Sequence, residues 1–198
     1  MRESCNNQEL QASALHPIFH LNRFTGTGMN RLLKKLVVIF ILALPLSAFA
    51  ADQQFADFDG NSKSISDYAG KGKWLVVMLW ASDCLVCNQE AHQYVDFHTS
   101  HKDKDAQMLG ISLDGASKKN DAREFLQRHK VNFPSLIGEP LAIATMYQER
   151  TGNTWIGTPS FMVFNPQGEL IGAQAGAVPV SIIESFIERE TASSQTKS

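Results

Sequence analysis

The stretch that decides the fold runs from Trp74 to Cys87 and reads WLVVMLWASDCLVC. Its first seven residues are apolar without polar alternation, which is typical of a central strand buried on both faces. Two cysteines separated by two positions follow the strand, where we expect the first turn of a helix. This order of strand, Cys-x-x-Cys and helix predicts a site for thiol-disulfide exchange.

The spacing of the two cysteines suits this chemistry. Two thiols in the first turn of a helix can close a small disulfide ring and reopen it with little backbone movement. The helix N-terminus presents unpaired amides and the positive end of the helix dipole to Cys84, which favours the thiolate there. We therefore predict Cys84 as the attacking nucleophile and Cys87, one turn further on, as the resolving thiol.

The cysteine pair has two structural alternatives, a zinc site and a permanent disulfide. A zinc site needs two more ligands at comparable spacing, and the sequence has no second such pair. His92, His98 and His101 follow on the same predicted helix and are interpreted as solvated side chains. A permanent structural disulfide is disfavoured because so short a loop removes little entropy from the unfolded chain. We favour the redox site and expect no metal.

The N-terminal fifty residues have the pattern of a secretory signal. Three basic residues precede the apolar stretch 36–44, and Ser47-Ala48-Phe49-Ala50 has the small-x-small form of a cleavage site. We predict a signal peptide over 29–50, and an uncleaved anchor is the weaker interpretation because a membrane span needs about twenty apolar residues. Residues 1–28 are interpreted as a mis-called extension, with Met29 as the true start.

Cleavage after Ala50 leaves 148 residues, enough for one domain with its own hydrophobic core. This part has 13 Lys and Arg against 18 Asp and Glu, a net charge of −5, which disfavours nucleic acid and anionic membranes as partners. Only two cysteines remain in it, and they are the adjacent pair. We predict a domain over 51–190 and a polar, disordered tail over 191–198.

Hydrophobic periodicity predicts a strand-helix-strand unit followed by a helix, an antiparallel hairpin and a last helix. The expected elements are a leading hairpin (55–59 and 63–66), strand 74–80, helix 84–101, strand 107–112, helix 117–129, extended segment 133–136, helix 141–147, a hairpin (161–164 and 170–173), and a helix with the apolar face Ile182, Ile183, Phe186 and Ile187. The fold class is therefore α/β, with a central mixed sheet flanked by helices.

This order of elements, with Cys84-Leu85-Val86-Cys87 and Thr158-Pro159 in place, resembles the thioredoxin fold. The Asp59-Gly60 turn, the segment 65–71 and the Gly168 that follows Thr158-Pro159-Ser160-Phe161 look like the TlpA-like branch of exported thioredoxins. The resemblance implies that Pro159 is cis and packed against the cysteines. It also implies that Thr158 offers backbone hydrogen bonds to an extended substrate strand.

Further site residues follow from the resemblance. Glu90 lies three positions after Cys87, where similar reductases have a glutamate, and could relay the proton of Cys87; a solvated surface glutamate is the equal alternative. Asp83 stands where the family commonly has Trp, and is a candidate N-cap. Trp80 and Trp155 are expected beside the site, in core packing or in contact with the substrate. Leu85 and Val86 give the site an apolar rim, which indicates a protein partner.

We therefore expect a periplasmic reductase of protein disulfides that acts as a monomer and has no cofactor beyond its Cys84-Cys87 disulfide. We expect its electrons to come from an upstream dithiol carrier, with a membrane-bound carrier as one option. Two alternatives remain open. A carrier could bind Cu(I) with the same two thiolates. A thiol peroxidase is disfavoured because Val77 and Ala81 replace the Pro and Thr of the Pro-x-x-x-Thr-x-x-Cys pattern.

Overall fold

The computed structural model describes residues 52–196, so the predicted signal peptide and the segment before it lie outside the described residues. The elements are, in chain order, β1 (Phe55–Asp57), β2 (Ser62–Lys63), the 3-10 helix η1 (Ile65–Asp67), β3 (Trp74–Trp80), α2 (Leu85–His101), β4 (Ala106–Ser112), α3 (Lys119–Arg128), β5 (Ser135–Ile137), α4 (Pro140–Thr151), β6 (Ser160–Phe164), β7 (Leu170–Ala175) and α5 (Val180–Gln195).

Strand β3 lies inside a seven-stranded mixed sheet with the order β2-β1-β5-β4-β3-β6-β7. It pairs in parallel with β4 and antiparallel with β6, and all seven of its residues are buried. The absence of polar alternation therefore predicted its burial on both faces correctly. The parallel β3-α2-β4 unit and the antiparallel β6-β7 hairpin are confirmed as well. The chain has the predicted α/β fold.

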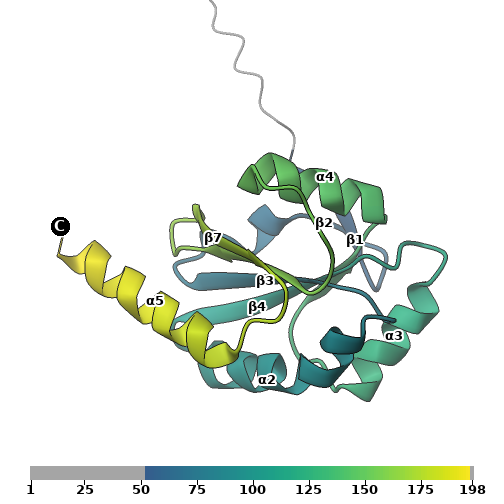
Figure 1. Cartoon of the computed structure of the whole chain (residues 1–198), viewed down its shortest axis with the longest axis horizontal. Helices are drawn as coiled ribbons and strands as arrows, with labels where there is room; N and C mark the ends of the chain where they lie inside the picture. The colour runs from purple at the N-terminus through teal and green to yellow at the C-terminus, as the bar shows by residue number, and fades with distance from the viewer. Residues whose placement is uncertain (1–51, 197–198) are drawn as a thin grey trace, which may run out of the picture. The chain divides into compact units, whose positions relative to one another are not determined.

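The two faces of the sheet have separate hydrophobic cores, because successive side chains of a strand point to opposite faces. One core combines the residues Trp74, Val76, Met78 and Trp80 of β3 with side chains of α2, α3 and α5. The other combines Leu75, Val77 and Leu79 with side chains of α4 and η1. Figure 1 shows α4 on one side of the sheet and α2 and α3 on the other.

The leading hairpin forms as predicted, with β1 paired to β2, and β1 also joins β5. Helix α4 is longer than the expected 141–147, because Pro140 opens it at the first turn and the left-handed Gly152 closes it. The predicted exposure of His98 on α2 is wrong, since this side chain is 5% exposed and faces the core.

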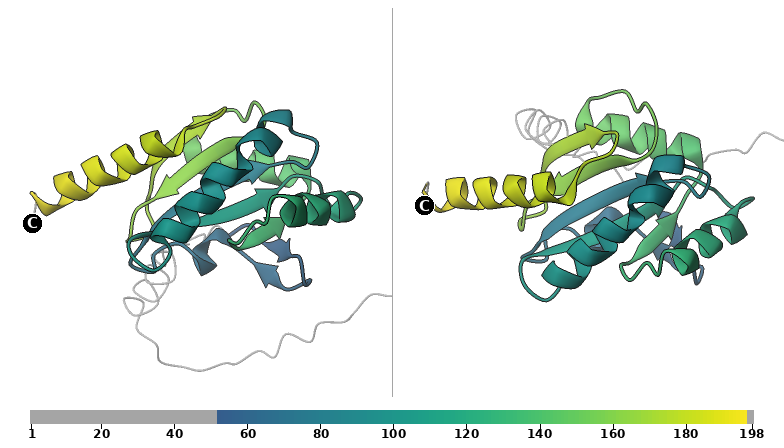
Figure 2. Two further views of the ribbon diagram at one scale, coloured as in Figure 1. Left: turned by 90° about the horizontal axis from the view of Figure 1, so that it is seen from below. Right: turned by 60° about the horizontal axis from the view of Figure 1, so that its bottom comes forward.

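The last helix corrects two expectations. Helix α5 continues to Gln195 and extends beyond the sheet in Figure 2, so the chain does not become a disordered tail at Thr191. The Thr191 hydroxyl accepts a hydrogen bond of 3.1 Å from the indole Nε1 of Trp74. Ile182, predicted on the apolar face, is 59% exposed, whereas Ile183 and Ile187 are buried. Among residues 52–196, the structure contains no helix that is long and apolar enough to cross a membrane.

Candidate active site

The cysteines follow a tight turn at the C-terminal end of β3. We call residues 81–84 the thiol turn; it is closed by a hydrogen bond of 3.2 Å from the Cys84 amide to the Ala81 carbonyl. Cys84 is itself the N-cap of α2, and its Sγ accepts the backbone N–H of Cys87 at 3.1 Å. The prediction of Asp83 as the cap is therefore wrong, because the sulfur occupies the capping position. A sulfur at the N-cap accepts hydrogen bonds from backbone N–H groups, and these favour the thiolate.

Cys84 and Cys87 form a disulfide, with their Cα atoms 5.2 Å apart. Their environments differ. Cys87 is fully buried against the core formed with α2, α3 and α5, whereas Cys84 is only partly buried. An incoming thiol or disulfide therefore reaches Cys84 first.

The Thr158–Pro159 peptide bond is cis, and Pro159 is buried at the start of β6. In the antiparallel register of β3 and β6, Ser160 lies opposite Leu79. Pro159 therefore comes at the level where β3 ends and the thiol turn begins. Its carbonyl accepts the amide of Gly176 at 2.8 Å. We call the segment 152–158, which leads into this proline, the proline loop.

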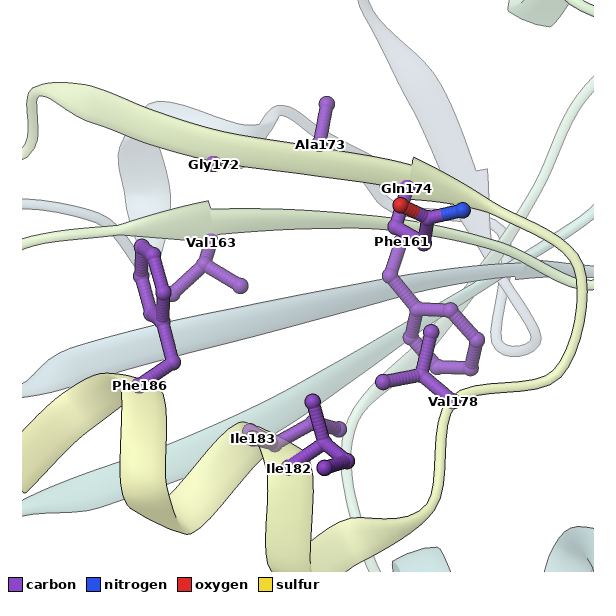
Figure 3. A pocket seen from close by; sticks show the side chains of 9 residues that line it. All are labelled: Phe161, Val163, Gly172, Ala173, Gln174, Val178, Ile182, Ile183 and Phe186. Atoms are coloured by element: carbon purple, nitrogen blue, oxygen red, sulfur yellow. The ribbon is translucent and has the colours of Figure 1, made fainter.

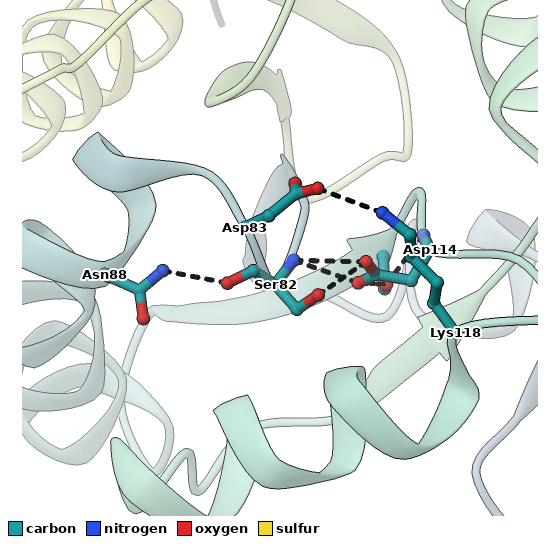
Figure 4. A network of polar contacts seen from close by, with 6 residues as sticks. Ser82, Asp83, Asn88, Asp114 and Lys118 are labelled. Carbon is teal, nitrogen blue, oxygen red and sulfur yellow. Dashed lines mark hydrogen bonds and ion pairs between the residues drawn. The ribbon is translucent and has the colours of Figure 1, made fainter.

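A buried carboxylate that the sequence analysis missed holds the thiol turn from one side. Asp114, at the end of β4, is 7% exposed. Its carboxylate accepts the backbone N–H of Ser82 at 3.0 Å, the Ser82 hydroxyl at 2.7 Å and the Ser112 hydroxyl at 2.6 Å (Figure 4). The sequence signal for this carboxylate was the polar Ser112-x-Asp114 at the end of an apolar strand. That signal does not indicate which loop Asp114 contacts.

Asn88, the residue after Cys87, holds the same turn from the other side and was also missed. Its Nδ2 donates to the carbonyls of Ser82 and Cys84, each at 2.9 Å. Its Oδ1 accepts from Arg128 Nη1 at 3.1 Å and contacts His129 Nε2 at 2.9 Å. The side chain thus connects the thiol turn to the C-terminal end of α3.

The negative charge of Asp83 beside Cys84 is paired. Lys118 directly precedes α3. Its Nζ lies 3.0 Å from Asp83 Oδ2, and both side chains are exposed (Figure 4). The hydrogen bond and charge of Asp83 raise the pKa of Lys118. The cation partly offsets the field of Asp83 at the cysteine, an interaction that salt screens.

Glu90 lies on α2 as predicted, and its carboxylate accepts hydrogen bonds from Gln93 Nε2 at 3.0 Å and from the Tyr94 hydroxyl at 3.1 Å. The Tyr94 hydroxyl also lies 3.1 Å from the Val178 carbonyl. Burial, followed by the neighbouring Glu90 charge, raises the pKa of Tyr94 well above its usual range. Tyr94 is a polar neighbour of Glu90 that the sequence did not indicate.

Trp80 does not face the substrate side. It is 1% exposed and stacks on Phe125 with ring centroids 4.3 Å apart. Of the two roles expected for Trp80, core packing is confirmed, and contact with the substrate is contradicted because the side chain is enclosed. Trp155, in the proline loop, is partly exposed, packs against the core on the α4 side, and has an Nε1 without a hydrogen-bond partner in the described part of the chain.

The histidines of α2 have separate environments. His98 Nδ1 accepts the backbone N–H of Met108 at 3.1 Å, and burial, followed by the Lys102 charge, lowers the His98 pKa. His101 contacts the carboxylates of Asp105 and Glu184. Within residues 52–196, no three His, Cys, Asp or Glu side chains form a group that could bind a metal ion.

An apolar cavity of about 210 Å³ lies between the β6-β7 hairpin and α5 (Figure 3). Neither cysteine lines it. Its lining residues are Phe161, Val163, Gly172, Ala173, Gln174, Val178, Ile182, Ile183 and Phe186. Nothing in this lining has the chemistry of the thiol site.

The AhpC/TSA family profile matches residues 46–173. The chain belongs to this family. A 102-residue segment is 31% identical to an uncharacterized protein of Haemophilus influenzae, covering 50% of this chain and 64% of that protein. The thiol-disulfide oxidoreductase ResA of Halalkalibacterium halodurans is 21% identical over a region that covers 67% of this chain and 69% of the ResA chain. Peroxiredoxin Bcp of Bacillus subtilis is 25% identical over a region that covers 66% of this chain and 84% of the Bcp chain.

Solved structures of similar fold are thiol-disulfide exchange proteins. The thioredoxin domain of an oxidoreductase from Bacteroides vulgatus matches with a TM-score of 0.56 and 20% identity, covering 70% of this chain and 94% of that one. A secreted disulfide oxidoreductase of Mycobacterium tuberculosis matches with a TM-score of 0.54 and 16% identity, and the match covers 70% of this chain and 96% of that one. The described domain is thus a thioredoxin-fold oxidoreductase of the thiol-disulfide class, as the resemblance implied.

Proposed function

We propose that the protein is an exported reductase of protein disulfides. The observation that carries this proposal is the unequal burial of the two cysteines, with Cys84 accessible at the cap of α2 and Cys87 enclosed behind it. A thiolate that is accessible and hydrogen-bonded to a backbone amide is suited to attack, and an enclosed thiol is suited to resolve.

In the proposed cycle, the Cys84 thiolate attacks one sulfur of a substrate disulfide and releases the other as a thiolate. The Cys87 thiolate then attacks Cys84 Sγ, which releases the second substrate thiolate and leaves the Cys84-Cys87 disulfide. Two electrons pass to the substrate, and the two thiolates take up protons. A second dithiol protein upstream, in solution or in the membrane, reduces the pair again and is itself oxidised to a disulfide. No cofactor beyond the disulfide takes part.

Two further roles belong to the proposal. The backbone of Thr158 beside Pro159 would hold an extended substrate segment by adding it as a strand. Glu90 would receive the proton of Cys87 as that thiol becomes the attacking group. The one-turn spacing on α2 supports this second role, and the hydrogen bond of Glu90 with Tyr94 gives the carboxylate a polar neighbour for a proton. The protein would act as a monomer.

Export rests on the signal-like pattern of residues 29–50. A structural neighbour from Mycobacterium tuberculosis is described as secreted, and another, from Streptococcus pneumoniae, as an exposed lipoprotein. Cell fractionation and N-terminal sequencing of the protein test this part. A mature N-terminus at Ala51 in a periplasmic extract supports periplasmic export, and a full-length cytoplasmic protein contradicts it.

Trapping tests the two cysteine roles. Cys87→Ser should accumulate mixed disulfides through Cys84, visible as high-mass bands that disappear on reduction, whereas Cys84→Ser should not. Equal trapping by both variants contradicts the assignment. The reduction potential tests the direction: about −230 mV or lower fits a reductase, and about −120 mV would make the protein an oxidant.

A further inference from the structure

The side chain of Asn88 uses every hydrogen-bonding site that an amide has. Its two N–H groups donate to the carbonyls of Ser82 and Cys84, and its oxygen accepts from Arg128 and lies 2.9 Å from His129 Nε2. Because the oxygen of Asn88 has no hydrogen, the His129 nitrogen must be the donor in this contact. A carboxamide with all its partners satisfied has one orientation.

This orientation gives the amide dipole a direction relative to the reacting sulfur. The oxygen of Asn88 faces the Arg128 guanidinium, and its N–H groups face the carbonyls on either side of Asp83. The positive end of the amide is therefore directed at the thiol turn. The Cys84 carbonyl also accepts the backbone N–H of Asn88 at 3.1 Å, the first hydrogen bond of α2.

The backbone of Cys84 sets where its sulfur lies. The Sγ contact to the Cys87 N–H, at 3.1 Å, exists because Cys84 occupies the N-cap with its carbonyl already in the helix. A side chain that fixes that carbonyl and the Ser82 carbonyl also fixes the distance from Sγ to this amide. Hydrogen bonds from backbone amides to a thiolate lower the pKa of the thiol.

We infer that Asn88 is a positioning residue of the thiol site, which holds Cys84 as the N-cap of α2 and so stabilises its thiolate. It acts through the turn and touches neither the sulfur nor the substrate. This inference rests on the proposed function in that it concerns the cysteine assigned as the nucleophile. It adds a determinant of the reactivity of that cysteine outside the Cys-x-x-Cys motif.

The test is the pH dependence of alkylation of Cys84 in the reduced full chain. Iodoacetamide is the probe. Cys84 and Cys87 lie on the same proteolytic peptide, so tandem mass spectrometry with fragmentation between the two cysteines distinguishes them, and Cys5 lies on a separate peptide. We expect Asn88→Ala to raise the apparent pKa of Cys84 by about 0.7 unit, a roughly five-fold lower acid dissociation constant, as expected for one lost hydrogen bond. Gln89→Ala, an exposed neighbour on the same helix, is the matched control and should leave this pKa unchanged.

A merely structural role would lower the melting temperature of Asn88→Ala and leave the Cys84 pKa at the wild-type value, and that result would overturn the inference. If Asn88→Ala does not fold, Arg128→Ala tests the inference instead. This substitution removes the cation that donates to the Asn88 oxygen, and it lies at an exposed position where the fold tolerates change. We expect a smaller rise in the Cys84 pKa in that variant, and no rise contradicts the inference. Alkylation requires no substrate, so its outcome is independent of whether trapping identifies Cys84 as the nucleophile.

Discussion

The two segments that flank the disulfide are held in different ways. The thiol turn is held by side chains from three other elements: Asp114 after β4, Asn88 on α2 and Lys118 before α3. The proline loop has its hydrogen bonds near its ends, from the amide of Gly152 to the helix before it and from the Ser160 hydroxyl to the Gly157 carbonyl. Between them, Trp155 packs against the core by apolar contact. Between these ends Ile156 is 79% exposed.

Under the proposed function, this difference separates chemistry from recognition. A reacting sulfur needs a defined position, because its reactivity depends on the few amides around it, and polar networks with satisfied partners provide that position. A segment that accepts many protein partners needs exposed backbone and apolar side chains. Leu85, which directly follows Cys84, is also an exposed apolar side chain, at 71%. The predictions below test whether the two segments differ in this way.

The largest expected effect concerns the stability of the thiol turn. Asp114→Ala leaves the N–H and hydroxyl of Ser82 and the hydroxyl of buried Ser112 without their acceptor, which should lower the free energy of unfolding by about 2–4 kcal/mol. Ile156→Ser in the proline loop should change it by less than about 0.5 kcal/mol. Urea denaturation measures both. Equal losses in the two variants would remove the distinction between the segments.

Binding of a protein substrate should depend on the exposed apolar side chains and not on the thiol turn. The double substitution of Leu85→Ser and Ile156→Ser should raise KM for a protein disulfide roughly five-fold, because two apolar side chains no longer bury surface against the partner. The rate with a small disulfide such as oxidised glutathione should stay within about two-fold of wild type, since the thiol turn is unchanged. A parallel loss with both substrates would mean that these side chains serve the chemistry instead.

Acid should act on the contacts that hold the thiol turn, because His129 contacts the Oδ1 of Asn88, whereas the proline loop contains no histidine. Burial, followed by the Arg128 charge, lowers the pKa of His129 in the folded state. As the pH falls below about 6.5, the unfolded chain therefore takes up this proton first, and stability decreases. His129→Gln keeps a donor for Asn88 but does not titrate.

The slope of unfolding free energy against pH between 7 and 5 should therefore be shallower in His129→Gln than in wild type, by a fraction of one proton. The remaining slope includes His98, whose pKa is lowered as well. Urea denaturation at a series of pH values measures it. Identical slopes would show that His129 has the same pKa in the folded and unfolded chains.

The smallest effect belongs to the exposed pair of Lys118 and Asp83. Lys118→Ala should slow alkylation of Cys84 by less than about two-fold at low ionic strength, because the charge of Asp83 then acts on the thiolate without its partner. The difference should disappear at about 0.5 M salt, where the Debye length is only a few ångströms. Lys119→Ala, its neighbour on α3, is the control. A slower rate that persists in high salt would indicate that Lys118 holds the turn by more than charge.

Several elements could be predicted because their signal is local. Strand β3 has the predicted bounds, α2 begins one residue later than expected, and the β6-β7 hairpin forms around the Asn165–Gly168 turn. The end of α5 was missed because the polar segment after Glu190 has no apolar stripe, and its contact with Trp74 joins positions 117 residues apart. The sequence left Trp80 between core packing and substrate contact, because strand position alone does not tell which neighbour covers a side chain.

The sequence by itself determined the fold class and the reactive pair, because strand burial and Cys-x-x-Cys spacing are properties of consecutive residues. Only the tertiary structure decided what surrounds that pair. Asp114 holds the thiol turn through contacts to Ser82, 32 positions away, and Asn88, which contacts the turn locally, is itself held by His129, 41 positions away. Such contacts depend on how β4 and α3 pack beside β3. The cysteine pair is thus encoded locally, whereas its environment arises from packing between distant segments.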